Sequence, residues 1–136
     1  MAVDRTTKEY FASHYKKYGK RWYDENKERQ RETQRRYREN NKERFLWRSA
    51  RLRAENKGLE FTIVESDINI PDVCPVFKVP FETGGMKGPS IDRIDNSKGY
   101  TPENIQVISR RANTMKGDAT YEEMKLFAEW VNSNGR

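Results

Sequence analysis

Hydrophobic and polar residues alternate most clearly just before a turn-rich segment in the second half of the chain. Residues 90–94 follow a period of two, with Ile91 on one face of the expected strand and its polar neighbours on the other. A run of Asp, Asn, Ser, Gly and Pro then predicts a long turn, after which residues 105–107 resume a strand. Ser109 is placed to cap a helix over residues 110–116. The pattern therefore predicts a strand–turn–strand–helix unit.

This unit would bring two oxygen-bearing side chains together. Asp92 lies on the first strand and Asn113 on the helix, and folding the unit back on itself places these elements side by side. A carboxylate and a neutral amide oxygen are ligands that suit a hard cation. We therefore expect a site for one divalent ion, Mg²⁺ or Mn²⁺, between Asp92 and Asn113.

The first half of the chain has a helical pattern instead. Residues 21–57 contain no Pro or Gly and are rich in helix-forming residues. A Glu-Asn-Lys motif, with a doubled Asn in its second copy, recurs about every fifteen residues. We expect one or two long helices that are kinked or broken near these Asn residues and end at Gly58. The helix is expected to dock on the core through Phe45, Leu46, Trp47 and Leu52.

The segment between this helix and the first strand is apolar but irregular. A capping box that begins at Thr62 favours a short helix, whereas a strand at residues 61–64 is the alternative. Three prolines then enforce an irregular path as far as residue 81, and residues 82–89 are expected to form a mobile loop. The apolar residues expected to enter the core from the irregular path are Val73, Cys74, Val76, Phe77, Val79 and Phe81.

After the central unit, Thr120 begins a second capping box with Glu123, and an amphipathic helix follows. Its apolar face is expected to pack on the protein through Tyr121, Met124, Phe127, Ala128 and Val131. The fold class is therefore predicted to be α+β. Residues 1–57 would form a basic helical arm, and residues 58–136 a small domain with the strand–strand–helix unit and a C-terminal helix.

Charge is distributed unevenly between these two parts. Residues 1–60 contain 18 Lys and Arg against 10 Asp and Glu, a net charge of +8, while residues 61–136 contain 9 against 11, a net charge of −2. A basic arm beside a nearly neutral domain predicts a polyanionic partner, of which nucleic acid is the usual one. The alternative is a solvated helix, because acidic residues are interleaved with the basic ones. A dimerisation helix ranks below DNA binding because the repeat is too polar for a good coiled-coil seam.

Cysteine content and hydropathy indicate where in the cell the protein acts. Cys74 is the single cysteine, so no disulfide can form within the chain, and paired-cysteine zinc clamps are absent. No apolar run is long enough to span a bilayer. We expect a cytoplasmic protein without a structural zinc ion or a membrane partner.

The motifs D-R-I-D, G-Y-x-P-x-N and R-x-N-x-x-K, which start at residues 92, 99 and 111, resemble the ββα-metal core of the HNH endonuclease family in its phage-type variant. The resemblance covers about a fifth of the chain and extends weakly over residues 59–131. It implies an HNH-like ββα-metal domain in which Asp92 and Asn113 bind the metal and Asn104 braces the hairpin. It also implies a phage protein that acts inside an infected bacterial host.

The chain departs from the family at the residue that takes the proton. Arg93 stands where the family has its general-base histidine, and a guanidinium stays protonated. Three alternatives follow: Asp95 acts as the base, the cation activates the water without a side-chain base, or the site is weak or inactive and Arg93 grips phosphate. Asp95 is also a common type of turn residue, and that role ranks ahead of catalysis.

The resemblance and the charge together predict a metal-dependent DNA endonuclease or nickase that binds the duplex backbone. The first alternative is an inactive HNH-like DNA-binding protein, and the second is a factor that docks on a host protein. The catalytic set is expected to be Asp92, Arg93, Asp95, Asn104 and Asn113. The residues expected to contact nucleic acid, or else to be exposed helix charges, are Arg35, Arg36, Arg38, Arg44, Arg48, Arg51, Arg110, Arg111 and Lys116.

Overall fold

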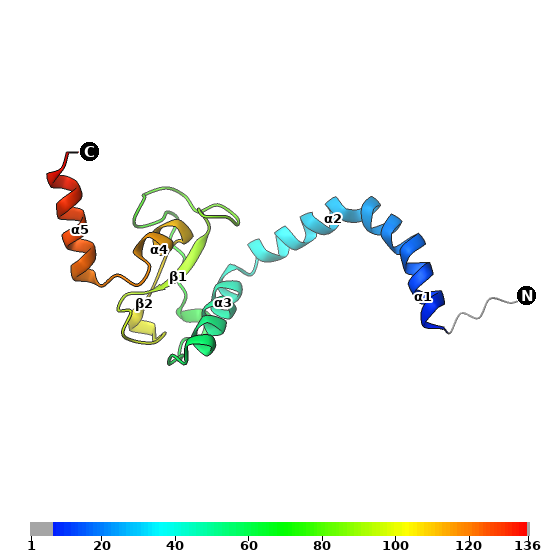
Figure 1. Cartoon of the computed structure of the whole chain (residues 1–136), viewed down its shortest axis with the longest axis horizontal. Coiled ribbons are helices and arrows are strands. Elements are labelled where there is room, and N and C mark those ends of the chain that lie inside the picture. The colour runs from blue at the N-terminus through cyan, green and yellow to red at the C-terminus, as the bar shows by residue number, and fades with distance from the viewer. Residues whose placement is uncertain (1–6, 136) are drawn as a thin grey trace, which may run out of the picture. The chain divides into compact units, whose positions relative to one another are not determined.

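The computed structural model describes residues 7–135, so the first six residues of the expected arm and the last residue of the chain lie outside the described residues. The fold is α+β, as predicted, with helices and one two-stranded antiparallel sheet (Figure 1). The chain forms two compact units, residues 1–40 and residues 41–136. Each unit is described on its own.

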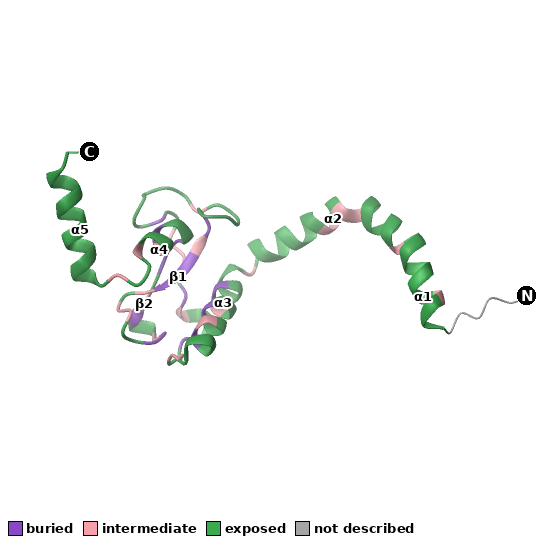
Figure 2. Cartoon of the chain, viewed as in Figure 1, coloured by how far each residue is buried: buried purple, intermediate pink, exposed green. Residues whose placement is uncertain are grey.

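The first unit is helical in its described part. It contains α1 (Lys8–His14), a π-helical turn (Tyr15–Gly19) and α2 (Lys20–Glu39). No described residue of these elements is buried (Figure 2). Ion pairs within α2, such as Arg21 Nε to Glu25 Oε1 at 2.8 Å, join side chains one turn apart. This helical unit is therefore held by local contacts rather than by a core.

The predicted break occurs at the second of the three motifs: α2 ends before Asn40, and α3 (Lys42–Lys57) begins after Asn41, whereas α2 continues unbroken through Asn26. Gly58 ends α3 in the left-handed conformation, with φ of +63°. The units divide after Asn40 rather than after residue 57, because α3 belongs to the second unit. Its buried residues are Leu46, Ala50 and Ala54.

The expected docking side of this helix was only partly right. Leu46 is buried and Trp47 is half-buried, whereas Phe45 is 36% exposed and Leu52 is 59% exposed. The expectation is wrong for Phe45 and Leu52. Ala50 and Ala54 follow Leu46 at intervals of one helical turn, and these two residues pack in the core instead. Because both side chains are small, the backbone of α3 can lie close to the strands.

The central unit has the predicted order. Strand β1 (Pro89–Arg93) pairs antiparallel with β2 (Ile105–Ser109), and α4 (Arg110–Lys116) follows without a linker. Ser109 caps α4 as expected, since its Oγ accepts from the Ala112 N–H at 3.1 Å. The strand–turn–strand–helix prediction is confirmed.

The core lies where α3 meets the hairpin (Figure 2). Ile91, the middle residue of β1, is 1% exposed, and the neighbouring Asp92 is only 3% exposed. Strand β1 is thus buried on both faces, unlike the half-exposed strand that its alternation predicts. Besides the α3 residues, the main cluster contains Ile63, Ile68, Ile91, Tyr100 and Val107.

The segment before β1 forms neither of the two structures that were weighed at residues 61–64. Phe61 makes an isolated parallel bridge to Tyr100, and a short 3₁₀ turn follows at Glu65–Asp67. The two backbone segments approach so closely there that a Cβ on Gly99 would lie 2.4 Å from the Glu60 carbonyl oxygen. Only glycine fits this position without a backbone shift.

The core expected from residues 73–81 was largely wrong. Cys74 is buried and Phe81 half-buried, but the other four apolar residues are between 38% and 56% exposed. The Cys74 N–H donates to the Val79 carbonyl at 2.8 Å, which closes a tight loop whose other side chains point outwards. The exposed residues are Val73, Val76, Phe77 and Val79.

Helix α5 (Tyr121–Ser133) begins with the predicted capping box, in which Thr120 Oγ1 accepts from the Glu123 N–H at 3.2 Å. The expected packing of its apolar face is wrong, because α5 contains no buried residue and Phe127 is 60% exposed. Among the described helices, none is both long enough and apolar enough to cross a bilayer.

Candidate metal and nucleic-acid site

Asn104 braces the turn between the two strands. Its Oδ1 accepts from the Asp95 N–H at 2.9 Å, and its Nδ2 donates to the Asp95 carbonyl at 3.1 Å and to the Gly99 carbonyl at 2.8 Å. The side chain is 5% exposed, so these bonds satisfy polar groups that are hidden from water. Asn104 therefore fixes the path of the turn and contributes no free ligand atom.

Asp92 is the buried carboxylate of the unit. Gln106 stands directly opposite it on β2, and Gln106 Nε2 donates to Asp92 Oδ2 at 2.8 Å. Lys116 Nζ donates to both carboxylate oxygens, at 2.9 Å to Oδ1 and 2.8 Å to Oδ2. A charge this deeply buried needs such a partner, since an unpaired carboxylate there would cost several kcal/mol.

Lys116 lies inside this site rather than out on the helix surface. Its side chain is 14% exposed, and Nζ also donates to the carbonyls of Arg93 and Ile94, the latter at 3.4 Å. The structure thus places Lys116 against four oxygens of β1 and its end. It is not an exposed helix charge, and contact with phosphate would require it to leave these oxygens.

Asn113 comes one helical turn before Lys116 and also reaches β1. Its Nδ2 donates to Ser90 Oγ at 3.0 Å and to the Ile91 carbonyl at 3.4 Å. Both bonds use the amide nitrogen, so neither consumes Oδ1, the atom that binds metals. Asn113 therefore bonds to the two residues that precede Asp92 on β1.

Arg93 is held by the turn. Its Nη1 donates to the Asn96 carbonyl at 2.9 Å and to the Lys98 carbonyl at 2.7 Å, and its guanidinium lies 5.6 Å from the centre of the Tyr100 ring. These contacts hold the Arg93 side chain against the first part of the turn. A guanidinium in this place stays charged and donates to backbone oxygens, so it is unsuited to accept a proton.

Asp95 is a turn residue whose carboxylate binds its own loop. Oδ1 accepts from Ser97 Oγ at 2.6 Å and from the Ser97 N–H at 2.9 Å. These hydrogen bonds, with the Lys98 ammonium 3.6 Å from Oδ2, hold the pKa of the Asp95 carboxyl below its ordinary value. A lower pKa makes Asp95 a weaker proton acceptor at neutral pH.

The oxygen atoms around Asp92 and the end of β1 are suited to bind a cation. Lys116 Nζ is itself a cation, and it is surrounded by carboxylate and carbonyl oxygens of the kind that Mg²⁺ and Mn²⁺ prefer. Asp92 and Asn113 are the ligands that the sequence predicts for such an ion. Within residues 7–135, no group of three or more His, Cys, Asp and Glu side chains gathers, so water and phosphate would have to complete its shell.

The expected nucleic-acid residues other than Lys116 lie on three helices, and all of them are exposed. On α2, Arg35 and Arg36 approach Glu32 at 3.3 Å and 3.7 Å, which leaves most of each side chain in solvent. On α4, the backbone N–H groups of Arg110 and Arg111 donate to carbonyls of the loop before β1, while the two side chains are exposed. The other exposed members are Arg38, Arg44, Arg48 and Arg51.

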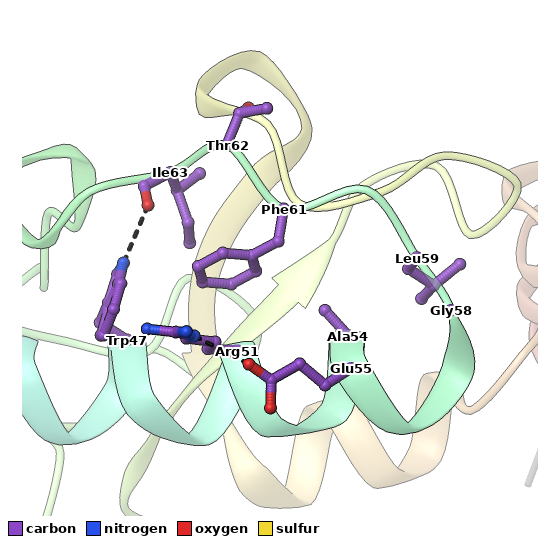
Figure 3. A pocket seen from close by; sticks show the side chains of 9 residues that line it. All are labelled: Trp47, Arg51, Ala54, Glu55, Gly58, Leu59, Phe61, Thr62 and Ile63. Atoms are coloured by element: carbon purple, nitrogen blue, oxygen red, sulfur yellow. Dashed lines mark hydrogen bonds and ion pairs between the residues drawn. The ribbon is translucent and has the colours of Figure 1, made fainter.

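A shallow pocket lies between α3 and residues 58–63 (Figure 3). Trp47 and Phe61 form its apolar wall, and Trp47 Nε1 donates to the Ile63 carbonyl at 2.8 Å. Arg51 pairs with Glu55 at 2.9 Å along its floor. Its lining includes neither Asp92 nor Asn113, so it belongs to the packing of α3 rather than to the candidate metal site.

Sequence reasoning missed two partners of Asp92. Gln106 could have been found from the hairpin register, because the residue opposite a strand position is its nearest cross-strand neighbour. Lys116 could have been found from helix geometry, since residues three apart share a face and Asn113 was already assigned to the face that meets β1. Arg53 was also missed here, and its Nη2 donates to the Ile91 carbonyl at 3.0 Å.

Comparison with known proteins assigns no relative to the chain: no family model, no curated protein and no solved structure matches it.

Proposed function

We propose that the protein is a metal-dependent DNA endonuclease or nickase of HNH type that hydrolyses phosphodiester bonds at its β1–β2–α4 unit. The observation that carries this proposal is that Asn113 bonds to Ser90 and Ile91, the two residues before Asp92 on β1, within a hairpin that Asn104 braces. These are the ligand and brace positions that the HNH resemblance assigns.

The residues of the proposed site have different roles. Asp92 would supply negative charge and Asn113 a neutral oxygen to a divalent ion. Such an ion, when bound, supplies positive charge to the scissile phosphate and to the leaving oxygen. Arg110 and Arg111, exposed at the start of α4, would hold the phosphate backbone beside it.

No suitable base is found among the candidates. Arg93 is charged and tied to the turn, and the pKa of Asp95 is lowered by Ser97. The proton of the attacking water would therefore pass to solvent. A positioned general base contributes roughly 10²–10⁴ in rate, so we expect cleavage to be slow by about that factor.

Plasmid cleavage tests this function. Supercoiled plasmid is incubated with the full chain and Mg²⁺ or Mn²⁺, and nicked product is measured. We expect nicking that is lost with EDTA, with Asp92→Ala and with Asn113→Ala, and retained in Asp118→Ala, an exposed aspartate beyond α4. Nicking that survives Asp92→Ala would mean that the activity does not come from this site.

A second candidate is an HNH-like DNA-binding protein without catalysis. It is favoured by the ion pair in which Lys116 neutralises Asp92, and by the use of Arg93 in the turn. This candidate predicts no nicking with either metal, together with DNA retention that weakens steeply as salt rises, because counterions are released on binding. Salt-insensitive binding to a host protein, without DNA retention, would instead support a factor that docks on a host protein.

A further inference from the structure

Lys116 occupies the place where the proposed function requires a metal ion. Its ammonium contacts both oxygens of Asp92 and two backbone carbonyls at the end of β1. The Asp92 side chain is 3% exposed and that of Lys116 is 14% exposed, so this is a largely buried pair and solvent screens it little. A surface pair would contribute at most about 1 kcal/mol, and this pair is not of that kind.

Two cations cannot share this carboxylate at full strength. Asp92 carries one negative charge, and Lys116 already neutralises it through both oxygens. A divalent ion at the same oxygens would lie within a few ångströms of the ammonium, and like charges at that distance repel strongly in a buried site. The flexible four-carbon stem of lysine allows the ammonium to withdraw towards solvent, where its charge is hydrated.

We propose that Lys116 is a tethered competitor of the metal: its ammonium holds Asp92 in the absence of a divalent ion and must be displaced before one binds. This inference rests on the proposed function, and it makes Lys116 a positioning residue that sets metal affinity rather than a phosphate contact. A purely structural ion pair, by contrast, would stay closed whether or not metal is present.

Metal affinity distinguishes the two roles. Mn²⁺ is titrated into the full chain by calorimetry, without DNA, for the natural protein and for Lys116→Met, which keeps most of the stem and removes the charge. We expect Lys116→Met to bind Mn²⁺ at least about tenfold more tightly. Adding Asp92→Asn to Lys116→Met is expected to abolish the binding.

Lys98→Met is the matched control. It removes one positive charge from the turn between β1 and β2, but the Lys98 side chain is 69% exposed and pairs with Asp95 rather than Asp92. We expect its Mn²⁺ affinity to equal that of the natural protein. An equal gain in both variants would overturn the inference, because it would reflect net charge alone.

A measurement on the natural protein covers the case in which Lys116→Met does not fold. An amine-acylating reagent is applied with and without Mn²⁺, and modification of each lysine is quantified by mass spectrometry. Displacement predicts that Mn²⁺ increases acylation of Lys116 and leaves Lys98 unchanged. Lys116 acylation that does not change at saturating Mn²⁺ would overturn the inference.

The outcomes separate this inference from the proposed function. Metal-dependent nicking with equal Mn²⁺ affinity in the natural protein and Lys116→Met would overturn the competitor role and leave the nuclease proposal intact. Absence of Mn²⁺ binding in both proteins, together with absence of nicking, would overturn both.

Discussion

The two units of the chain are stabilised in different ways. In residues 7–40 no helical residue is buried, and contacts run between side chains three or four positions apart. In residues 41–135 the core joins α3, the 59–68 segment and the hairpin, which are far apart in the sequence. The comparison shows that the first unit is held by local contacts alone in its described part, whereas the candidate site exists only because distant segments meet.

The largest expected difference is in the response to a deleted side chain. Ile91→Ala removes a residue that is 1% exposed, so we expect it to lower the free energy of unfolding by about 2–5 kcal/mol. Trp22→Ala in α2 removes a larger side chain that is 58% exposed, and we expect a change below about 0.5 kcal/mol. Denaturant unfolding of both variants checks this. Equal losses would contradict the contrast between the units.

Glycine replacements give the next largest contrast. Gly99→Ala places a Cβ 2.4 Å from a backbone oxygen of Glu60, so we expect a loss of about 1–3 kcal/mol in the free energy of unfolding. Gly19→Ala meets only the ring of Tyr15, which is 73% exposed and can move. We expect it to change helix stability by less than about 1 kcal/mol, as read from helical circular dichroism. A tolerated Gly99→Ala would disprove the close approach.

Removal of a helix cap is expected to change stability by about 1 kcal/mol, and it should act differently in the two units. Ser109→Ala removes the cap of α4, and since α4 packs on the hairpin we expect global stability to fall by about that amount. Thr7 caps α1, because its Oγ1 accepts from the Tyr10 N–H at 3.2 Å, and Thr7→Ala removes this cap. We expect it to fray α1 without shifting the denaturant midpoint of the second unit. Hydrogen exchange and denaturant unfolding report these effects, and a midpoint shift in Thr7→Ala would couple the units.

The smallest expected effect depends on pH. Because the folded-state pKa of Asp95 lies below its ordinary value, the ionised side chain stabilises the fold at neutral pH, and this contribution is lost as pH falls through the folded pKa. The stability difference between the natural protein and Asp95→Ala should therefore be larger at pH 7 than at pH 3. Asp24→Ala, in α2, is the control for loss of an aspartate. A difference that is constant with pH would rule out the Ser97 contacts as its source.

What could be predicted from the sequence follows the same division. The caps at Ser109 and Thr120, the helix end at Gly58 and the break near Asn40 all depend on neighbours within a few residues, and all are confirmed. They need no knowledge of the rest of the fold.

Burial was predicted less well because hydropathy identifies an apolar residue but not what covers it. Phe77 and Phe127 are both exposed, although each belongs to an apolar pattern. The partners of Asp92 were missed for a related reason, since Gln106 and Lys116 are polar residues whose role appears only once β1, β2 and α4 are brought together. The metal and DNA roles remain predictions.

The most direct measurement compares cutting and DNA retention on the same samples. Asp92→Asn should lose metal-dependent nicking of supercoiled plasmid and keep its retention of DNA. A variant with Gln at positions 35, 36 and 38 should reduce the slope of log affinity against log salt, by about one for each phosphate that the protein no longer neutralises. If Asp92→Asn nicks as well as the natural protein, the assignment of cutting to the hairpin is contradicted. If the Gln variant binds DNA with an unchanged salt slope, the prediction that Arg35, Arg36 and Arg38 contact DNA is contradicted.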